Sequence, residues 1–284
     1  MAPEHTRLAS SLVGSTSQVV RSLEDIPDPI AQARIREILS HPASLGFLVC
    51  GSRATGWALP DADTDGFWYV SPAHYRSLSL EETQIRIFAE GEFPKRMVAD
   101  VSVFSDEAFE EQLRSPLDID HWPYLDAVVL ADSDGRLADW RRRIAAFPEE
   151  SFRERAIHKF LQLVIAFHYA TMDDVRGYTV DRQLNLHRAA LAGVHLWFTL
   201  RRRWAPPLKW WTREVERLEI RPDSRAVLEG AIVNPTIETL THLRDHLKTE
   251  ARYAGVAEID DVLREFFKSL LPENRAAVYR NSHL

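Results

Sequence analysis

The chain has 284 residues, of which 45% are hydrophobic and 27% are charged, and its formal net charge is −7. This balance is typical of a globular protein with a full core, and it argues against a broad nucleic-acid surface, which needs many cationic side chains. There is no run of about 18 apolar residues, no pattern of a signal peptide and only one cysteine, Cys50. We therefore expect a cytoplasmic protein without a membrane span, an internal disulfide or a zinc site.

The first half of the chain alternates helical and strand-like patterns. Helices are predicted over residues 8–23 and 30–39, and a short apolar run over 47–50 has the length of a buried strand. Residues 53–60 carry the turn signals glycine and proline, and a second apolar run covers 67–70. These two runs are expected to pair as neighbouring strands.

The pattern continues to a proline at position 148. Strands are predicted over 84–89, 97–104 and 127–130, and helices over 106–113 and 137–146. The sheet is therefore expected to be mixed and to be flanked by helices.

Beyond Pro148 the patterns are helical only. Ser151 and the glutamate three residues later predict a capping box, followed by a helix to about residue 172. Further helices are predicted over 180–203, over 209–218 and in the remaining segments to residue 280. The expected fold class is α+β, with a nucleotidyltransferase-type mixed-sheet domain over 1–147 and an all-helical domain over 148–284.

Two carboxylates stand just before the second apolar run. Asp63 and Asp65 are two residues apart, so on an extended chain they face the same side, near the Gly51–Ser52 turn. Two ionised carboxylates about 4 Å apart repel by roughly 4 kcal/mol at an effective dielectric of 20, and a divalent cation removes that repulsion. Oxygen ligands favour Mg²⁺, a glycine lets the backbone approach a phosphate, and the serine adds a hydroxyl donor. A solvated turn rich in aspartate is the structural alternative, and the nearby Asp61 is assigned to it.

Gly-Ser, ten residues and then Asp-x-Asp resembles the signature of the DNA polymerase beta-like nucleotidyltransferase superfamily. That superfamily carries a third carboxylate on a later strand, and Asp100 within Met97–Phe104 fits the place. The resemblance implies that Asp63, Asp65 and Asp100 are the catalytic metal ligands. Thr64 and Gly66 depart from the usual apolar residues, and Gly66 predicts a loosened strand or a bulge.

The order of the two halves resembles the aminoglycoside and lincosamide adenylyltransferases, in which a helical domain closes over the nucleotide site. Residues 196–211, LWFTLRRRWAPPLKWW, are similar to a helix-to-loop segment of that group and contain Lys209. Lys209 is a candidate for the β- or γ-phosphate. Arg53 is a second candidate, because its donors match phosphate oxygens, with a loop arginine as the alternative.

The expected activity is a Mg²⁺-dependent transfer, with two ions, of a nucleoside monophosphate from ATP or another nucleoside triphosphate to a hydroxyl. The resemblance alone implies a small acceptor such as an aminoglycoside, and hence antibiotic resistance. Asp173, Asp174 and Asp181 are candidates for an acidic surface that attracts a polycation. Transfer to a protein side chain or an RNA end, and a nucleotide-binding regulator with little catalysis, stay open as alternatives. Glu90 and Glu92 are weaker candidates than Asp100 for the general base.

Overall fold

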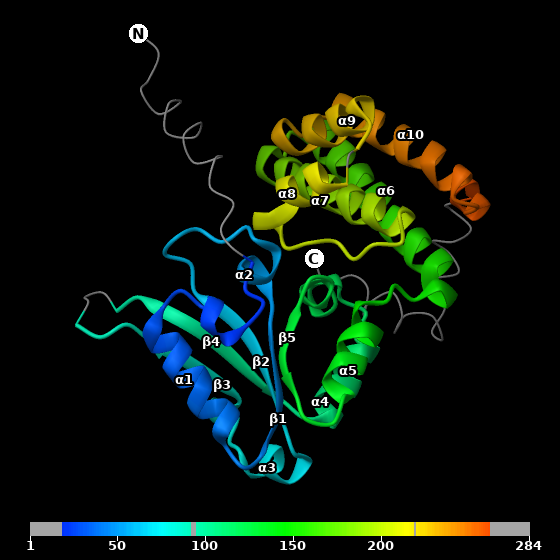
Figure 1. Ribbon diagram of the computed structural model, residues 1–284. Coiled ribbons are helices and arrows are strands. Elements are labelled where there is room, and N and C mark those ends of the chain that lie inside the picture. Colours follow the sequence, from blue (N-terminus) through cyan, green and yellow to red (C-terminus); the bar gives the residue numbers. More distant parts are fainter. Residues whose placement is uncertain (1–18, 92–94, 219, 262–284) are drawn as a thin grey trace. The chain divides into compact units, whose positions relative to one another are not determined.

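The computed structural model describes residues 19–91, 95–218 and 220–261 (Figure 1). Contacts divide these residues into two compact units, which we call the sheet unit (described residues of 1–115 and 123–146) and the helical unit (described residues of 116–122 and 147–284). The segment 116–122 therefore groups with the helices, although the sequence-based boundary lies at 147. No helix within the described ranges combines the length and the apolar character needed to cross a membrane.

The sheet unit contains five strands in the order β3-β4-β2-β1-β5. Their bounds are β1 (Ser44–Val49), β2 (Thr64–Val70), β3 (Gln84–Phe88), β4 (Met97–Phe104) and β5 (Val128–Asp132). β2 and β4 run parallel, and the other neighbours are antiparallel. This mixed sheet with flanking helices, followed by a helical half, confirms the predicted α+β class.

Helices cover both faces of the sheet (Figure 1). They are α1 (Pro29–Ser40), α2 (Gly51–Thr55), α3 (Pro72–Ser77), α4 (Asp106–Arg114) and α5 (Arg136–Ala145), with 3-10 turns η2 (Leu23–Asp25), η3 (Glu81–Thr83) and η5 (Trp122–Tyr124). α1 packs on the face that carries Phe47 and Trp68, whereas α4 and α5 pack on the face that carries Leu48 and Tyr69. The alternation of side chains along each strand thus builds two apolar layers.

Asp106, at the start of α4, joins the sheet to its second helical layer. Its carboxylate accepts hydrogen bonds from the Tyr69 hydroxyl (2.7 Å) and from Trp140 Nε1 (2.9 Å), and it pairs with Arg136 Nη1 (2.6 Å). Burial and the carboxylate of Asp106 raise the pKa of Tyr69 well above its ordinary value. The phenol therefore stays protonated and keeps donating at any physiological pH.

Two local predictions are wrong, and a third is wrong in the part of it that the structure describes. Of the helix expected over 8–23, residues 8–18 lie outside the described ranges, and residue 23 alone is helical, within η2. Residues 51–55 form α2 where a turn was expected, and Gly56 ends that helix with a φ of 76°. Gly66 pairs regularly with Val49 and Val101, because its missing side chain leaves space for the ring of Phe47.

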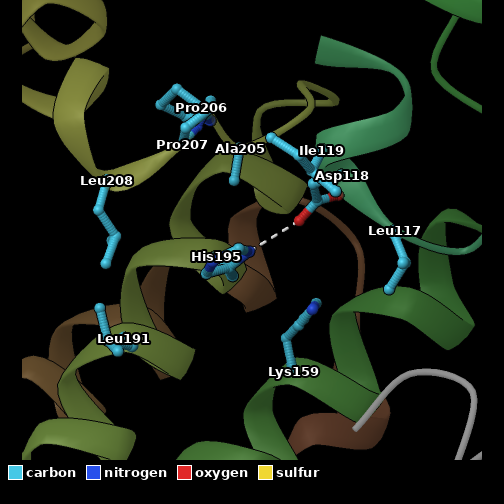
Figure 2. Close-up of a pocket in the computed structure, with 10 residues that line it drawn as sticks. All are labelled: Leu117, Asp118, Ile119, Lys159, Leu191, His195, Ala205, Pro206, Pro207 and Leu208. Carbon is cyan, nitrogen blue, oxygen red and sulfur yellow. Dashed lines mark hydrogen bonds and ion pairs between the residues drawn. The ribbon is translucent and has the colours of Figure 1, made fainter. Parts of the chain in front are cut away.

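The helical unit has five helices and four 3-10 turns among its described residues. They are α6 (Phe152–Arg176), α7 (Thr179–Leu200), α8 (Trp211–Arg217), α9 (Pro222–Val233), α10 (Ile237–Tyr253), η4 (Asp118–Asp120), η6 (Glu149–Ser151), η7 (Leu208–Trp210) and η8 (Ala257–Asp261). Asp118 attaches its segment to this unit, because its carboxylate bonds to Arg155 on α6 and to His195 on α7. Figure 2 shows the contact with His195. The predicted capping box is absent at Ser151, whose hydroxyl donates to the carbonyl of Pro148 instead.

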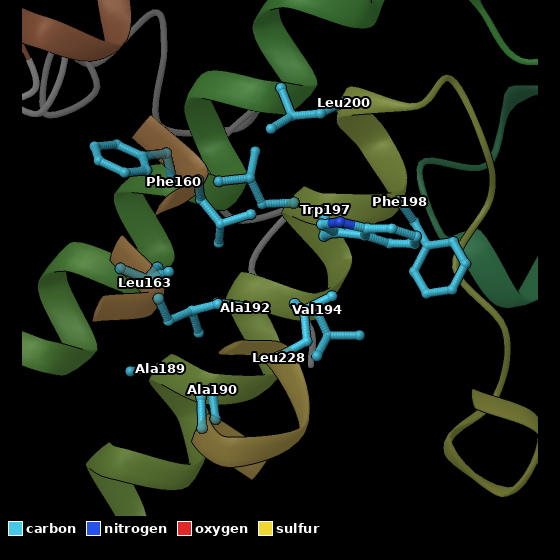
Figure 3. Packing of buried hydrophobic residues seen from close by; sticks show 14 of the residues in the cluster. Phe160, Leu163, Ala189, Ala190, Ala192, Val194, Trp197, Phe198, Leu200 and Leu228 are labelled. Carbon is cyan, nitrogen blue, oxygen red and sulfur yellow. The ribbon is translucent and has the colours of Figure 1, made fainter. Parts of the chain in front are cut away.

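The core of the helical unit lies between α6, α7, α9 and α10 (Figure 3). Small residues on α7 let the helices approach closely, and Gly193 is the tightest of these positions. A Cβ added at Gly193 would lie 2.6 Å from a methyl carbon of Leu243 and 3.1 Å from one of Leu163. Both leucines are fully buried, so neither can move without disturbing the core.

We expect Gly193→Val to lower the free energy of unfolding by roughly 1–3 kcal/mol, because overpacking a dense core forces strain. Gly230→Ala is the matched control, since a Cβ at this helical position meets nothing within 4 Å. It should raise the stability by up to about 1 kcal/mol through helix propensity alone. Urea denaturation of both variants tests the packing, and equal effects of the two substitutions would contradict it.

Candidate functional site

The strongest site in the sheet unit is a carboxylate pair on two neighbouring parallel strands. Asp65 on β2 lies directly opposite Asp100 on β4 in the register. Both residues alternate with neighbours that face α1, so both side chains stand on the face of Leu48 and Tyr69. Neighbouring strands lie about 4.8 Å apart, so the two carboxylates occupy one location.

The backbone of Gly51 lies against one member of this pair. Its φ is 64°, which favours glycine, and an added Cβ would collide with Asp65 Oδ2. The amide of Cys50 donates to the carbonyl oxygen of Asp65 (3.0 Å). Burial and then the negative charges of Asp65 and Asp100 raise the pKa of the Cys50 thiol well above its ordinary value. Cys50, Gly51 and the two carboxylates therefore form one compact group, and Cys50 is an unreactive part of its wall.

Strand β3 holds Asp100 from its other side. Gln84 Nε2 donates to Asp100 Oδ1, and Gln84 Oε1 accepts from the hydroxyl of Ser102 (3.0 Å). Arg86 Nε lies 4.0 Å from Asp100 Oδ2 and is largely exposed. Gln84 thus orients the Asp100 side chain, whereas Arg86 compensates little of its charge. Neither residue was predicted as part of the site, although Gln84 and Arg86 lie two positions apart on the predicted strand over 84–89.

The predicted phosphate ligand Arg53 points into the protein. It is 5% exposed, and its Nη2 donates to the carbonyl oxygens of Pro60 and Ala62. Burial lowers its pKa, while the charges of Asp63 and Asp61 act in the opposite direction. Arg53 therefore stabilises the loop that carries Asp63. This is the structural role that was the alternative to phosphate binding. Contact of Arg53 with a phosphate stays a prediction.

The other predicted ligands are Ser52, Asp63 and Lys209, for which the structure gives a position and a degree of burial. Ser52 is buried in α2, with 6% of its surface exposed. Asp63 is half-buried and precedes β2 by one residue. Lys209 is exposed in η7 of the helical unit, with its Nζ 5.4 Å from the ring centroid of Trp210. The roles of Ser52, Asp63 and Lys209 stay predictions.

The residues fit a magnesium ion as a pair rather than as a trio. No group of three or more His, Cys, Asp or Glu close enough to hold a metal exists among the residues that the structure describes. The set Asp63, Asp65 and Asp100 is thus a prediction of which the register brings two members together. Mg²⁺ is commonly held by one or two carboxylates together with substrate phosphates, so Asp65 and Asp100 suffice as its protein ligands.

The expected acidic surface for a polycation is not formed as predicted. Asp173 is buried and accepts a hydrogen bond from Asn185 Nδ2 (2.9 Å), and Asp174 pairs with Arg182. Asp181 is exposed. Of the weaker candidates for the general base, Glu90 is exposed, and Glu92 lies outside the described residues.

Comparisons with known proteins name no substrate. The model of a family described as a domain of unknown function, DUF4037, matches residues 123–211, which is less than half of the chain. No curated protein matches the chain. Among solved structures the chain is similar to a nucleotidyltransferase-like protein from Exiguobacterium sibiricum 255-15, with 14% identity, a TM-score of 0.48 and coverage of 83% of this chain and 79% of that chain. At that identity and TM-score the likeness has no bearing on function.

The contact between Gly51 and Asp65 leads to a prediction about metal binding. We expect Mg²⁺ to raise the melting temperature of the natural chain, because an ion that binds only the folded state stabilises it. Gly51→Ala should abolish this rise, since the added methyl group displaces the Asp65 carboxylate. Melting curves with and without Mg²⁺ measure the effect.

Gly135→Ala is the matched control for that variant. Gly135 has a similar φ of 77°, and a Cβ there meets nothing within 4 Å. Both variants therefore carry the same backbone strain, of about 1–2 kcal/mol, but Gly135→Ala should keep the full Mg²⁺ response. Loss of the response in both variants, or in neither, would contradict the site.

Proposed function

We propose that the chain is a Mg²⁺-dependent nucleotidyltransferase whose metal ligands are Asp65 and Asp100, with Asp63 as the predicted third ligand. The observation that carries the proposal is the register of β2 and β4, which sets Asp65 opposite Asp100 beside Gly51. Two carboxylates at this separation repel by about 3.5 kcal/mol at an effective dielectric of 20. A bound cation turns that cost into binding energy, and the neighbouring glycine leaves space for a phosphate.

The proposed reaction transfers a nucleoside monophosphate, AMP where the co-substrate is ATP. An acceptor hydroxyl oxygen forms a bond to the α-phosphorus, the bond from that phosphorus to the bridging oxygen breaks, and pyrophosphate leaves. The Asp100 carboxylate takes the hydroxyl proton, and Gln84 holds it in the required orientation. Bound Mg²⁺, as two ions, would neutralise charge on the attacking and leaving oxygens.

The acceptor is proposed as a small hydroxylated molecule. An aminoglycoside remains the candidate that the sequence resemblance implies, but the buried Asp173 and paired Asp174 give it less acidic surface than expected. Transfer to a protein side chain or an RNA end, and nucleotide binding without transfer, are the alternatives that the experiment must separate.

The test follows pyrophosphate release with a panel of nucleotides and acceptors. Asp65→Asn and Asp100→Asn should each lower the rate about a thousandfold or more, because each removes several kcal/mol of transition-state stabilisation. Asp63→Asn should behave in the same way if Asp63 completes the metal site. Asp61→Asn is the matched control, since Asp61 is exposed and lies outside the pattern.

Near-normal turnover of both Asp65→Asn and Asp100→Asn would overturn the proposal. Mg²⁺-dependent nucleotide binding by the natural chain without release of pyrophosphate for any acceptor would favour the regulator instead.

A further inference from the structure

The helical unit contains a pocket of about 230 Å³ between α6, α7 and the segments around Asp118 and Pro206 (Figure 2). Three ionisable side chains line it, namely Asp118, Lys159 and His195, and the other lining residues are apolar. In Figure 2, Lys159 and His195 lie on neighbouring helices and extend toward the same space. All residues that line the pocket belong to the helical unit, whereas the carboxylate pair belongs to the sheet unit.

Both oxygens of Asp118 are already engaged. Oδ1 pairs with Arg155 Nη2 at 2.8 Å, and Oδ2 accepts from His195 Nδ1 at 2.7 Å. Burial alone would raise the pKa of Asp118, but the hydrogen bond from His195 and the charges of Lys159 and Arg155 outweigh it and lower the pKa. Asp118 is therefore ionised and supplies one negative charge.

Lys159 lacks a direct partner. It is 8% exposed, one turn after Arg155 on α6, and it makes none of the hydrogen bonds or ion pairs found among the described residues. Arg155 is also buried, and its guanidinium lies 4.6 Å from the ring centroid of Trp204. Two buried cations thus face one buried anion, which leaves one excess positive charge at the pocket. An excess buried charge is costly unless a counter-ion pairs with it.

The apolar wall continues beyond this charged end. Leu191 and Leu208 line the first pocket and also a second one, of about 380 Å³, whose other walls include Val194, Trp211 and Ile232. Glu229 is the ionisable residue of the second pocket, and it is paired with Arg225 at 2.7 Å. The two pockets therefore adjoin each other, and we call them together the groove, which has a cationic end and an apolar body.

We propose that this groove binds a small amphipathic anion, whose carboxylate or phosphate pairs with Lys159 and His195 and whose hydrocarbon part lies along Leu191, Leu208 and Trp211. Such a ligand neutralises the excess charge and covers the apolar walls at the same time. His195 donates to the anion through Nε2 when it is protonated, because its Nδ1 is held by Asp118.

The experiment measures binding to the full chain by calorimetry, with octanoate, octyl phosphate, octylamine and 1-octanol as probes. The two anions should bind at least tenfold more tightly than octylamine and octanol. The ratio between octanoate and octyl phosphate shows which anionic group the site prefers. Affinity should rise about fourfold for each methylene from butanoate to octanoate, as expected from about 0.8 kcal/mol per buried CH₂.

Lys159→Met should weaken octanoate at least tenfold, and Lys159→Arg should retain most of the affinity because it keeps the charge. Lys248→Met is the matched control, since Lys248 lies on α10 of the same unit and pairs with Asp260 at its surface. Circular dichroism establishes that each variant is folded. Unchanged octanoate binding by folded Lys159→Met, or equal binding of octylamine and octanoate, would overturn the proposal.

The proposal for the groove and the proposal for the transfer reaction can be tested independently. Asp65→Asn should abolish pyrophosphate release and leave octanoate binding intact, because Asp65 belongs to the sheet unit. Loss of octanoate binding in folded Asp65→Asn would contradict a separate site.

Discussion

The parallel pairing of β2 with β4 is the constraint on which the sheet unit's candidate chemistry depends. This register places two carboxylates side by side, and a shift of one residue would send one of them to the opposite face. β2 is held in place by the fit of Gly66 to the ring of Phe47, by its uninterrupted parallel register with β4 and by its antiparallel pairing with β1. A close pair of acids is costly in the folded chain alone, so its presence beside a glycine favours a bound cation.

The helical unit carries a charge cluster of the opposite kind. The two oxygens of Asp118 bond to Arg155 and His195, and the charge of Lys159, one turn after Arg155, also acts on that carboxylate. The sheet unit has an excess of negative charge at its site, and the helical unit has an excess of positive charge in its pocket. The ligands that we propose for the two centres therefore carry opposite signs, a cation at Asp65 and Asp100 and an anion at Lys159 and His195.

Much of the sheet unit follows from local patterns. The apolar runs around Phe47 and Phe67 and the alternation around Asp100 predicted β1, β2 and β4, since buried strands leave a strong signal. The sequence predicted that Asp65 lies near the Gly-Ser turn. The structure places Gly51 against Asp65, where a Cβ would collide with the carboxylate and where the φ of 64° favours glycine. The turn predicted over 51–55 was wrong, because this segment forms α2. Its Arg53 is buried and donates to the carbonyl oxygens of Pro60 and Ala62 in the following loop, a tertiary contact that local propensity does not reveal.

The pocket of the helical unit could not be predicted in the same way. Asp118, Lys159 and His195 are 36 to 77 positions apart and have no common motif, so only the tertiary fold brings them together. Gln84 was missed for a related reason, because a polar residue on a predicted strand is ordinarily a solvated one. Pairing across strands, rather than sequence spacing, gives it a role next to Asp100.

The most direct test of the central claim is a crystal structure of the chain with Mn²⁺ and a non-hydrolysable nucleoside triphosphate, with Mn²⁺ located by its anomalous scattering. The expected result is an anomalous peak in direct coordination with the carboxylates of Asp65 and Asp100 and with phosphate oxygens. A nucleotide and metal bound elsewhere, with the two carboxylates free of any ion, would contradict the claim.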